Sequence, residues 1–491
     1  MNLLDARDLI YYSGTPASAR QLRGFDGVPT AITEAAMSDA FDRRTLLRLG
    51  VTAGMAVPLI GLTPAPTSTA ATSSAATSAE CRPRFPDKWF PVTHFGAVGD
   101  GRTDDTSAFR RAIEACHRAG GGHVLVTGIH ATGPIHLLSH VDLHLAAGSM
   151  LRFSTDPNDY LPVVYSRWQG IEFMNYSPLV YAHGQTDIAV TGSGVLDGQA
   201  DATHWWDWKS LGDAEFPQLE AQANGGVPVR GRVFGQGFHF RPPFMQPYRC
   251  DRVLIQGVTF TNSPFWHLNP VLCTNVTVDG VTVNSSGPNT DGCDPESCDG
   301  VLITGCSFNT GDDCIAIKAG RNADGRRVNV PCQNIVIAHS TFANGHGGVT
   351  IGSEMTGGVR NVHGHDLTMN STGLASCHRI KTNSVRGGFV ESVLLERVDV
   401  GAVGGPMLLI DFNYGEGDTG QYLPTVTDIN LADWAVQSCK QGWQMAGYHR
   451  DPIGTVRLSD VEITAMSGAN VATDVRNLRL RNVTIGGRPA G

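Results

Sequence analysis

The chain has 491 residues and a formal net charge of −9, and only 17% of its residues are charged. This length suffices for one large or two medium domains and excludes a minimal module. The net negative charge argues against a nucleic-acid partner, because phosphate binding needs a basic patch. It does not exclude an anionic sugar, for which a few local cations suffice. The 58 glycines and the low charge content favour an all-β fold.

Residues 1–80 read as an N-terminal extension, an export signal and a linker. Arg43 and Arg44 form a basic pair, and an apolar stretch then runs from Leu49 to Leu62. That order is typical of a twin-arginine signal, and the stretch is short for the ~20 residues of a membrane-spanning helix. Residues 63–80 are nearly all Ala, Ser, Thr and Pro, which predicts a cleavage region and linker. We expect a secreted or periplasmic protein, free of the membrane after processing, with its catalytic fold in residues 81–491.

The cysteines predict no metal centre. There are 11 of them, so at least one is unpaired whatever disulfides form. Four of those inside the repetitive part of the chain lie close together, and we expect them to stack as small apolar side chains in a core: Cys293, Cys298, Cys306 and Cys314. None has the spacing of a zinc finger.

One amphipathic helix is predicted over residues 105–119, with Thr103 or Asp105 as its cap and Gly120–Gly122 as its end. The apolar residues at helical spacing are Phe109, Ala112, Ile113 and Cys116. We expect no second helix of comparable quality, because the remaining pattern is that of strands.

From about residue 186 the chain repeats a polar residue or two followed by a short alternating strand. Such units begin near residues 186, 251, 274, 299, 333, 360, 391, 427, 455 and 476. Repeats of this kind predict a solenoid, and their strand character makes it a parallel β-helix. The helix at 105–119 precedes the later coils and would cover the open apolar end. A β-sandwich is the alternative, but regular hairpin turns are not evident.

Acidic residues recur in consecutive coils. Asp312 follows Asp291 by 21 positions, which we take as one coil, and Asp313 is its neighbour in sequence. Carboxylates crowded in this way cannot all keep an ordinary pKa. One protonated and one ionised carboxyl group is what cleavage of a glycosidic bond requires. His346, flanked by Gly345 and Gly347, follows one coil later, where the glycines would let a substrate approach.

Two cations follow in the next coil. Alternation along a strand places Arg379 and Lys381 on the same face. Beside an acidic site, this pair would hold the carboxylate of a substrate. Each motif alone could equally be a polar corner of a coil, but the four motifs in register favour a site.

Together these motifs resemble the signature of the polygalacturonase family, glycoside hydrolase family 28. The matching segments are Asn289-Thr290-Asp291, Gly311-Asp312-Asp313, Gly345-His346-Gly347 and Arg379-Ile380-Lys381. Flanking segments that also match are 95–101, 263–268 and 287–289, so the resemblance covers roughly residues 91–490. It implies a right-handed parallel β-helix that hydrolyses α-1,4-galacturonosidic bonds with inversion, without a metal or other cofactor.

The resemblance also implies roles for the acidic residues. Asp312 would be the general acid, and Asp291 and Asp313 would activate the attacking water. His346 would support the proton balance around Asp312.

The remaining roles concern the substrate, an anionic plant polysaccharide or oligogalacturonide bound by a monomer. Arg379 and Lys381 would bind the galacturonate carboxylate, and Tyr414 stands where the family has a substrate-contacting tyrosine. Asn289 would orient Asp291 or touch the sugar. Asp294 and Glu354 were expected to be hydrogen-bonding structural acids.

Three alternatives stay open on the sequence. They are a β-helix pectate lyase using calcium, a hydrolase of rhamnogalacturonan or xylogalacturonan, and a binding module without turnover. Long loops at 200–247 and 319–332 would block one end of a groove, which favours exo cleavage. Trp205, Trp206 and Trp208 could stack on sugar or simply pack the loop.

Overall fold

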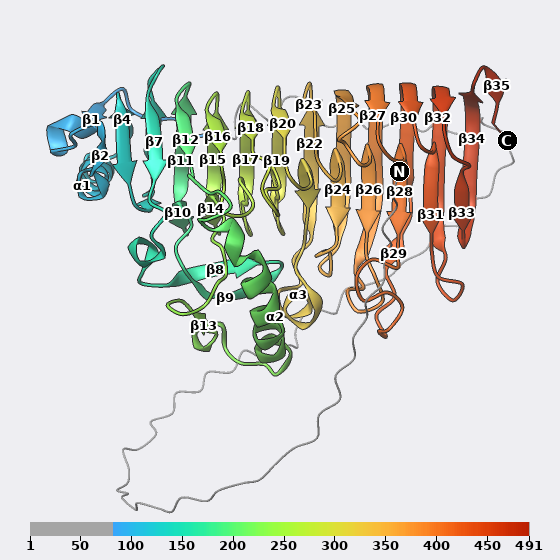
Figure 1. Cartoon of the computed structure of the whole chain (residues 1–491), viewed down its shortest axis with the longest axis horizontal. Helices are drawn as coiled ribbons and strands as arrows, with labels where there is room; N and C mark the ends of the chain where they lie inside the picture. Colours follow the sequence, from blue (N-terminus) through green and yellow to red (C-terminus); the bar gives the residue numbers. More distant parts are fainter. Residues whose placement is uncertain (1–81, 491) are drawn as a thin grey trace, which may run out of the picture. The chain divides into compact units, whose positions relative to one another are not determined.

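Strands in this chain pair almost entirely in parallel, coil upon coil. The computed structural model describes residues 82–490, so the expected export signal and linker lie outside the described residues. The antiparallel strand pairs within the described part are β8–β9 and β34–β35. Figure 1 shows the coils stacked in chain order, from blue to red. The predicted parallel β-helix is confirmed.

Each of the first coils contributes one strand to each of two rows of a 23-stranded sheet. The first row contains β1 (Trp89–Pro91), β3 (Gly122–Val126), β6 (Val141–Leu145), β11 (Thr186–Gly192), β15 (Asp251–Gln256), β17 (Thr274–Asp279), β19 (Asp299–Thr304) and β22 (Cys332–Ala338). The second row contains β2 (Asp100–Asp104), β4 (Ile129–Thr132), β7 (Met150–Phe153), β12 (Val195–Asp197), β16 (Thr259–Thr261), β18 (Thr282–Asn284), β20 (Ser307–Asn309) and β23 (Thr341–Phe342). Four of the predicted repeats thus start at the first residue of a first-row strand, namely β11, β15, β17 and β19.

In the later coils the two rows merge into single long strands. β25 (Val359–Ser371) pairs with both β22 and β23, which joins the rows. The sheet continues through β27 (Phe389–Val403), β30 (Ile429–Cys439), β32 (Ile453–Met466) and β34 (Val475–Ile485), with short β29 (Thr425–Val426) and β35 (Arg488–Pro489).

A third row closes the coils on the remaining side. It starts with β5 (Ile135–His136), β10 (Val180–His183) and β14 (Met245–Tyr248). Isolated bridges at Leu268 and Cys293 carry it onward. It ends with the six-stranded sheet of β21 (Ile315–Ile317), β24 (Val349–Gly352), β26 (His378–Lys381), β28 (Leu408–Asp411), β31 (Trp443–Ala446) and β33 (Val471–Thr473).

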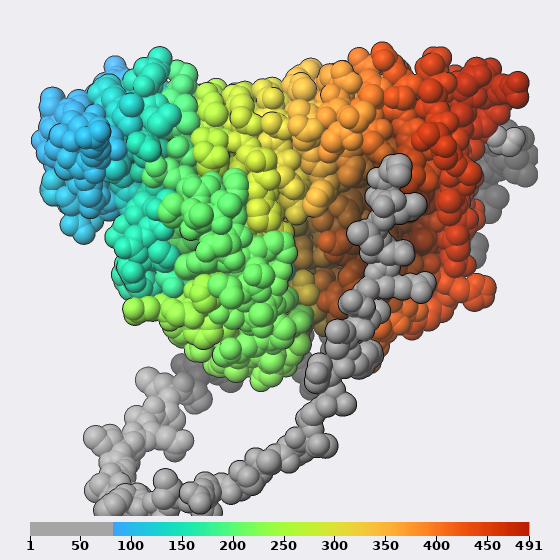
Figure 2. All heavy atoms as spheres, viewed as in Figure 1, coloured from blue at the N-terminus to red at the C-terminus, as the bar shows by residue number. Residues whose placement is uncertain are grey.

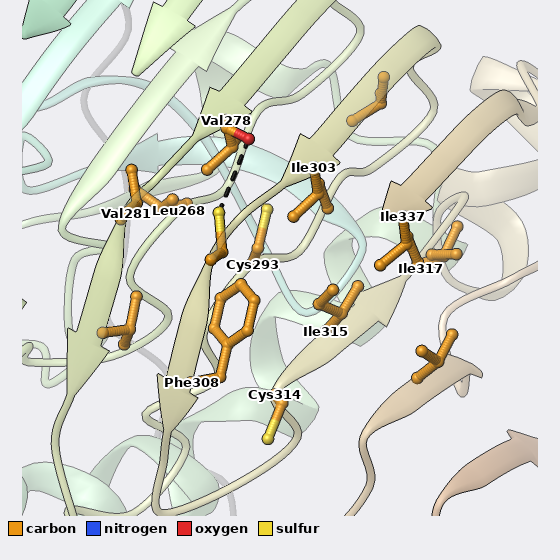
Figure 3. Close-up of a cluster of buried hydrophobic side chains, with 14 of the residues drawn as sticks. Leu268, Val278, Val281, Cys293, Ile303, Phe308, Cys314, Ile315, Ile317 and Ile337 are labelled. Atoms are coloured by element: carbon orange, nitrogen blue, oxygen red, sulfur yellow. Dashed lines mark hydrogen bonds between the residues drawn. The ribbon is translucent and has the colours of Figure 1, made fainter. Parts of the chain in front are cut away.

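The core fills the space enclosed by the three rows. In Figure 3, Ile303 and Ile337 of the first row, Phe308 of the second and Ile315 of the third point toward one another. Phe308 also stacks on Phe342 of the next coil, with ring centroids 5.7 Å apart. Equivalent side chains of successive coils thus pack on one another inside the β-helix, so each repeat depends on its neighbours to bury its apolar face.

The cysteines contribute to this core. The ten cysteines in the described residues are all buried and none is in a disulfide. Cys293 and Cys314 lie among the apolar side chains of Figure 3, as the sequence predicted.

Helix α1 (Thr106–Arg118) packs on the first coil, and all four residues of its predicted stripe are buried. Asp105 precedes the helix but does not cap it. Its carboxylate instead accepts hydrogen bonds from the amides of Val98 and Gly99 and pairs with His130. The prediction that this helix covers the first coil is therefore confirmed. The prediction that a side chain caps the start of the helix is wrong.

An insertion stands out from the coils, teal to green in Figure 2, and it includes most of the long loop expected at 200–247. It contains β8 (Val164–Trp168), β9 (Ile171–Asn175), α2 (Lys209–Asn224) and β13 (Val233–Phe234), and it lies next to α3 (Asn322–Val328). Short 3-10 turns are η1 (Val92–Phe95), η2 (Pro157–Tyr160), η3 (Trp206–Trp208) and η4 (Val229–Gly231). The expectation of a single clear helix was wrong, because α2 buries only a few scattered residues and contains Pro217, which hides its period.

The three tryptophans at 205–208 pack this insertion onto the coils. Trp205 is 2% exposed, and Trp208 meets it edge to face. The indole N–H of Trp206 donates to the carbonyl of Ser263 at 2.9 Å. The packing alternative is therefore the one that the structure supports. In residues 82–490 no helix is both long and apolar enough to span a membrane.

Replacing Phe308 by alanine tests the shared core. The side chain is fully buried, so Phe308→Ala should lower the free energy of unfolding by roughly 3–5 kcal/mol. The control is Val98→Ala, since Val98 is 58% exposed and should change it by less than about 0.5 kcal/mol. Chemical denaturation followed by circular dichroism measures both. Equal changes in the two variants would contradict a core shared by the three rows.

Candidate active site

The acidic residues lie on the third row, where the register between coils is fixed. Cys293 pairs with Ile315 in the next coil. Asp291 and Asp313, each two residues earlier, are therefore the true neighbours. The prediction that Asp291 and Asp312 are one coil apart was wrong by one residue, because the register advances by 22 positions.

The structure still brings all three carboxylates together. One oxygen each from Asp291, Asp312 and Asp313 lies within 4.8 Å of the other two. Asp291 and Asp313 are buried, and the side chain of Asp312 is 16% exposed. The crowding expected from the sequence is thus present, with Asp312 the member that reaches solvent.

Asp313 is held by cations and a hydroxyl. The ammonium Nζ of Lys381 donates to Oδ2 at 2.7 Å, and the hydroxyl of Thr350 donates to Oδ1 at 3.0 Å. The guanidinium of Arg379 lies 3.6 Å from Oδ1. The prediction that Arg379 and Lys381 share a face beside the acids is confirmed. The ring of Tyr414 lies 5.5 Å and 5.2 Å from these two cationic groups.

Asp312 pairs with His346, whose Nδ1 lies 2.9 Å from Oδ1. Burial alone would raise the pKa of Asp312, but the hydrogen bond from His346 and the charge of Lys381 lower it to about 2. The same bond raises the pKa of His346, whose side chain is 56% exposed. In the free chain, Asp312 is therefore ionised and His346 stands at the mouth of the site.

Asn289 contacts Asp312 and not Asp291. Its amide nitrogen is 3.4 Å from Oδ2 of Asp312, and its carbonyl accepts a 2.7 Å bond from Arg241. The expectation that Asn289 orients Asp291 is not supported, because the register places it beside Asp312.

Asp291 is the acid with the least compensation. Its Oδ1 is buried without a hydrogen-bond partner. Burial first, and then the charges of Asp294 and Asp312, raise the pKa of Asp291. Burial also raises the pKa of Asp294 to about 8, although Lys318 lies 3.5 Å away. In the free chain, burial thus favours the protonated form of both Asp291 and Asp294.

Asp294 is therefore not the hydrogen-bonding structural acid that was expected, since both of its oxygens lack hydrogen-bond partners and its contact is the ion pair with Lys318. Glu354 fits that expectation better. It accepts from Lys318 at 3.2 Å, and burial, which would raise its pKa, is outweighed by Lys318, so that its pKa lies well below the ordinary value.

The glycines around His346 serve packing. A side chain at Gly345 would meet the carbonyl of Asp312 at 2.6 Å, and one at Gly347 would meet Thr350 at 2.2 Å. These glycines let the coil lie closely over the acids; the expectation that they give a substrate room is not supported.

The site opens into a cavity of about 620 Å³. Predicted residues that line it are Asn289, Asp291, Asp312, His346, Arg379, Lys381 and Tyr414, whereas Asp313 lies behind them. Sequence reasoning missed Gln169, Trp266, Lys318, Arg321, Arg386 and Glu416 as lining residues. A signal existed for Lys318 alone, because alternation after the apolar Ile315 and Ile317 marks position 318 as polar.

Salt bridges join three lining residues of the cavity, Arg321, Arg386 and Glu416, to one another and to the insertion. Arg321 contacts Glu220 of α2 at 3.3 Å and Glu416 at 3.0 Å. Arg386 contacts the same oxygen of Glu416 at 2.8 Å. The turn before β9 also joins in, since the amide of Arg321 bonds the carbonyl of Gly170.

Two groups in residues 82–490 have donors close enough for a metal ion, namely Asp291, Asp312 and Asp313, and His339, His365 and Asp366. Carboxylate oxygens suit hard cations. However, Asp313 already holds Lys381, Asp312 holds His346, and Asp366 holds Arg397. These partners compensate the acids with cationic side chains.

Comparison with known proteins gives a consistent result. The model of the glycosyl hydrolases family 28 matches residues 232–483. The crystal structure of a hyperthermoactive exopolygalacturonase from Thermotoga maritima is 40% identical, with a TM-score of 0.79 over 83% of this chain and 93% of that one. A probable polygalacturonase from Vitis vinifera is 29% identical over 79% of this chain and 77% of its own length.

The polygalacturonase from Erwinia carotovora shares the fold, with a TM-score of 0.62 at 23% identity over 81% of this chain and 98% of that one. The family match favours the hydrolase over the lyase and the binding module. It spans just over half of the sequence and includes every residue of the acidic and cationic motifs. The chain therefore belongs to glycoside hydrolase family 28.

Proposed function

We propose that the chain hydrolyses α-1,4-galacturonosidic bonds of polygalacturonate. The observation that carries the proposal is the trio of carboxylates within 4.8 Å, set beside Arg379 and Lys381 in one cavity. The acids supply a proton and activate water, and the cations hold a uronate carboxylate. The similarity to an exopolygalacturonase at 40% identity supports this substrate.

Asp312 is proposed as the general acid, although in the free chain its pKa is about 2. Lys381 contributes to that low value. A substrate carboxylate paired with Lys381 and Arg379 would cancel their charge and raise the pKa of Asp312. Binding of a uronate would thereby prepare the acid.

Asp291 and Asp313 are proposed to activate the water. For this, Asp291 must be ionised, which burial opposes in the free chain by raising its pKa. Because the oxygens of Asp291 and Asp312 lie within 4.8 Å, one transfer, direct or through a water, deprotonates the base and protonates the acid. His346 would then hold Asp312 in position.

Inversion is proposed from the motif resemblance. The nearest oxygens of the acids are closer than the ~6.5–9.5 Å spacing usual between the carboxyl groups of inverting glycosidases. The water would therefore be held against the buried pair Asp291 and Asp313 together. The first product should carry the β-anomeric configuration.

A substrate with a good leaving group tests the role of Asp312. We expect Asp312→Asn to lower kcat on oligogalacturonate by about 10²–10⁴-fold. It should retain most of its activity on 4-nitrophenyl galacturonide, because 4-nitrophenolate leaves without protonation. The matched variant Asp291→Asn should lose activity on both substrates. If Asp291→Asn, and not Asp312→Asn, kept its activity on 4-nitrophenyl galacturonide, Asp291 would be the general acid and Asp312 would activate the water.

We further propose exo cleavage. In support of this mode, Arg321 and Glu416 line the same cavity as the acids and would block the path of a long polymer on their side of it. Arg321 is tied to Glu220 of the insertion, so opening this side would break partly buried charge contacts.

Early products of a polygalacturonate digest test this mode. Chromatography should show only mono- or digalacturonate, and viscosity should fall slowly relative to the release of reducing ends. Proton NMR of the same early digest should show the β-anomer first. A ladder of oligomers would contradict exo cleavage, and an α-anomer would contradict inversion.

We also propose export by the twin-arginine route, which rests on Arg43, Arg44 and the apolar stretch after them. Replacing both by lysine should retain the precursor inside the cell in a fractionation assay. The control is Arg48→Lys, which leaves the pair intact. Normal export of the double variant would refute the route.

A further inference from the structure

A second cavity, of about 460 Å³, lies on the outer face of the first row, in the N-terminal coils. Its lining includes Phe85, Trp89, His123, His144 and Gln256. None of its residues lines the catalytic cavity on the third row. The segment leading into β1 is held over this face by a 3.0 Å salt bridge between Arg82 and Asp279.

An exposed aromatic ring forms one side of the cavity. Trp89 is 48% exposed, which is high for so large an apolar side chain. One face of its ring stacks on His123, with centroids 4.5 Å apart and planes at 23°. His144 meets it edge-on at 5.4 Å. The indole is therefore fixed in place while much of its surface stays open to a ligand.

A buried carboxylate fixes both imidazoles. Asp142 is 2% exposed, and its Oδ2 lies 2.7 Å from Nδ1 of His123. Asp142 also accepts from the hydroxyl of Thr191, which in turn lies 2.8 Å from Nδ1 of His144. Both histidines thus use Nδ1 internally. Within residues 82–490, neither Nε2 has a hydrogen-bond partner.

The amide of Gln256 completes the polar side. Its nitrogen donates to Asp279 at 2.9 Å, and its carbonyl oxygen has no partner in the described chain. Two imidazole nitrogens and one amide oxygen therefore remain for hydrogen bonds to a ligand, beside an exposed indole. Hydroxyl groups, which both donate and accept, match such groups, and the apolar face of a pyranose or furanose matches the indole.

We propose that this cavity is a second saccharide site, and that it takes a neutral sugar residue. The charge argues for a neutral ligand. Asp142 contributes a fixed negative charge directly behind the two histidines, and no Lys or Arg lines the cavity. A uronate would meet that charge without a compensating cation, in contrast to the catalytic cavity with Arg379 and Lys381.

The second site is inferred from the cavity itself, whereas the choice of pectic side-chain sugars as its ligands rests on the proposed function. Side-chain sugars of pectic polymers, such as galactan and arabinan, are neutral and would allow the protein to hold a branched polymer during attack elsewhere. Binding can be measured with oligosaccharides that are not substrates, so failure of one proposal is distinguishable from failure of the other.

Isothermal titration calorimetry of the full chain with 1,4-β-galactotetraose and 1,5-α-arabinotetraose tests the site. At least one should bind, and Trp89→Ala should weaken its binding by tenfold or more. The control is Val98→Ala, also exposed but outside the cavity, which should bind like the parent chain. Hydrolysis of trigalacturonate should be unchanged in both variants.

A second variant guards against misfolding. His144→Ala leaves Trp89 in place and removes one acceptor, and it should also weaken binding, with an unchanged circular dichroism spectrum. Absence of binding by either tetrasaccharide, or full affinity in both site variants, would overturn the proposal. Binding of trigalacturonate that is lost in Trp89→Ala would overturn the neutral class of ligand.

Discussion

The register of the third row is the constraint on which the candidate active site depends. Successive coils pair in parallel, so a residue at one position of a coil lies directly beside its counterpart in the next. Cys293, Ile315 and Val349 are such counterparts, and they point into the core. Because burial of these apolar residues prevents slippage, the acids that precede Cys293 and Ile315 are placed by the core and need no loop to position them.

That placement concentrates charge, and the structure compensates it unevenly. Asp313 has Lys381 and Asp312 has His346, but Asp291 and Asp294 share only the more distant Lys318. Isolated buried carboxylates are costly when ionised, so burial raises the pKa of both Asp291 and Asp294. The uneven compensation thus raises the pKa of Asp291 and lowers that of Asp312, which is the division of labour that acid–base chemistry uses.

Much of the fold and of the candidate site could be predicted from the sequence, because a repeat protein is built by stacking coils along one axis. Each coil contributes the same kind of strand, so motif order along the chain becomes motif order in space. The error of one residue at Asp312 arose because coil length was counted between motifs and not between core residues. The apolar Cys293 and Ile315 would have given the correct register.

The insertion could not be predicted in the same way. Helix α2 packs through Leu219 and Ala223 against residues far away in sequence, so its own pattern carries little signal. The residues that it brings to the cavity, such as Arg321 and Glu416, come from separate loops. Contacts of this kind form only when distant segments pack together. Because these segments lie outside the repeats, the sequence pattern does not predict which of their residues meet.

The two cavities differ in a way that follows from which row carries them. On the third row, Arg379 and Lys381 lie next to the acids, and the site carries charges of both signs. On the first row, Trp89 lies beside a single buried carboxylate with two histidines, and no Lys or Arg lines the cavity. A site with Arg and Lys selects for a charged group, because a counter-ion offsets the loss of hydration. A site with an indole and polar groups but without Lys or Arg instead selects for apolar faces and hydroxyls, so one solenoid can bind two chemically different parts of the same polymer.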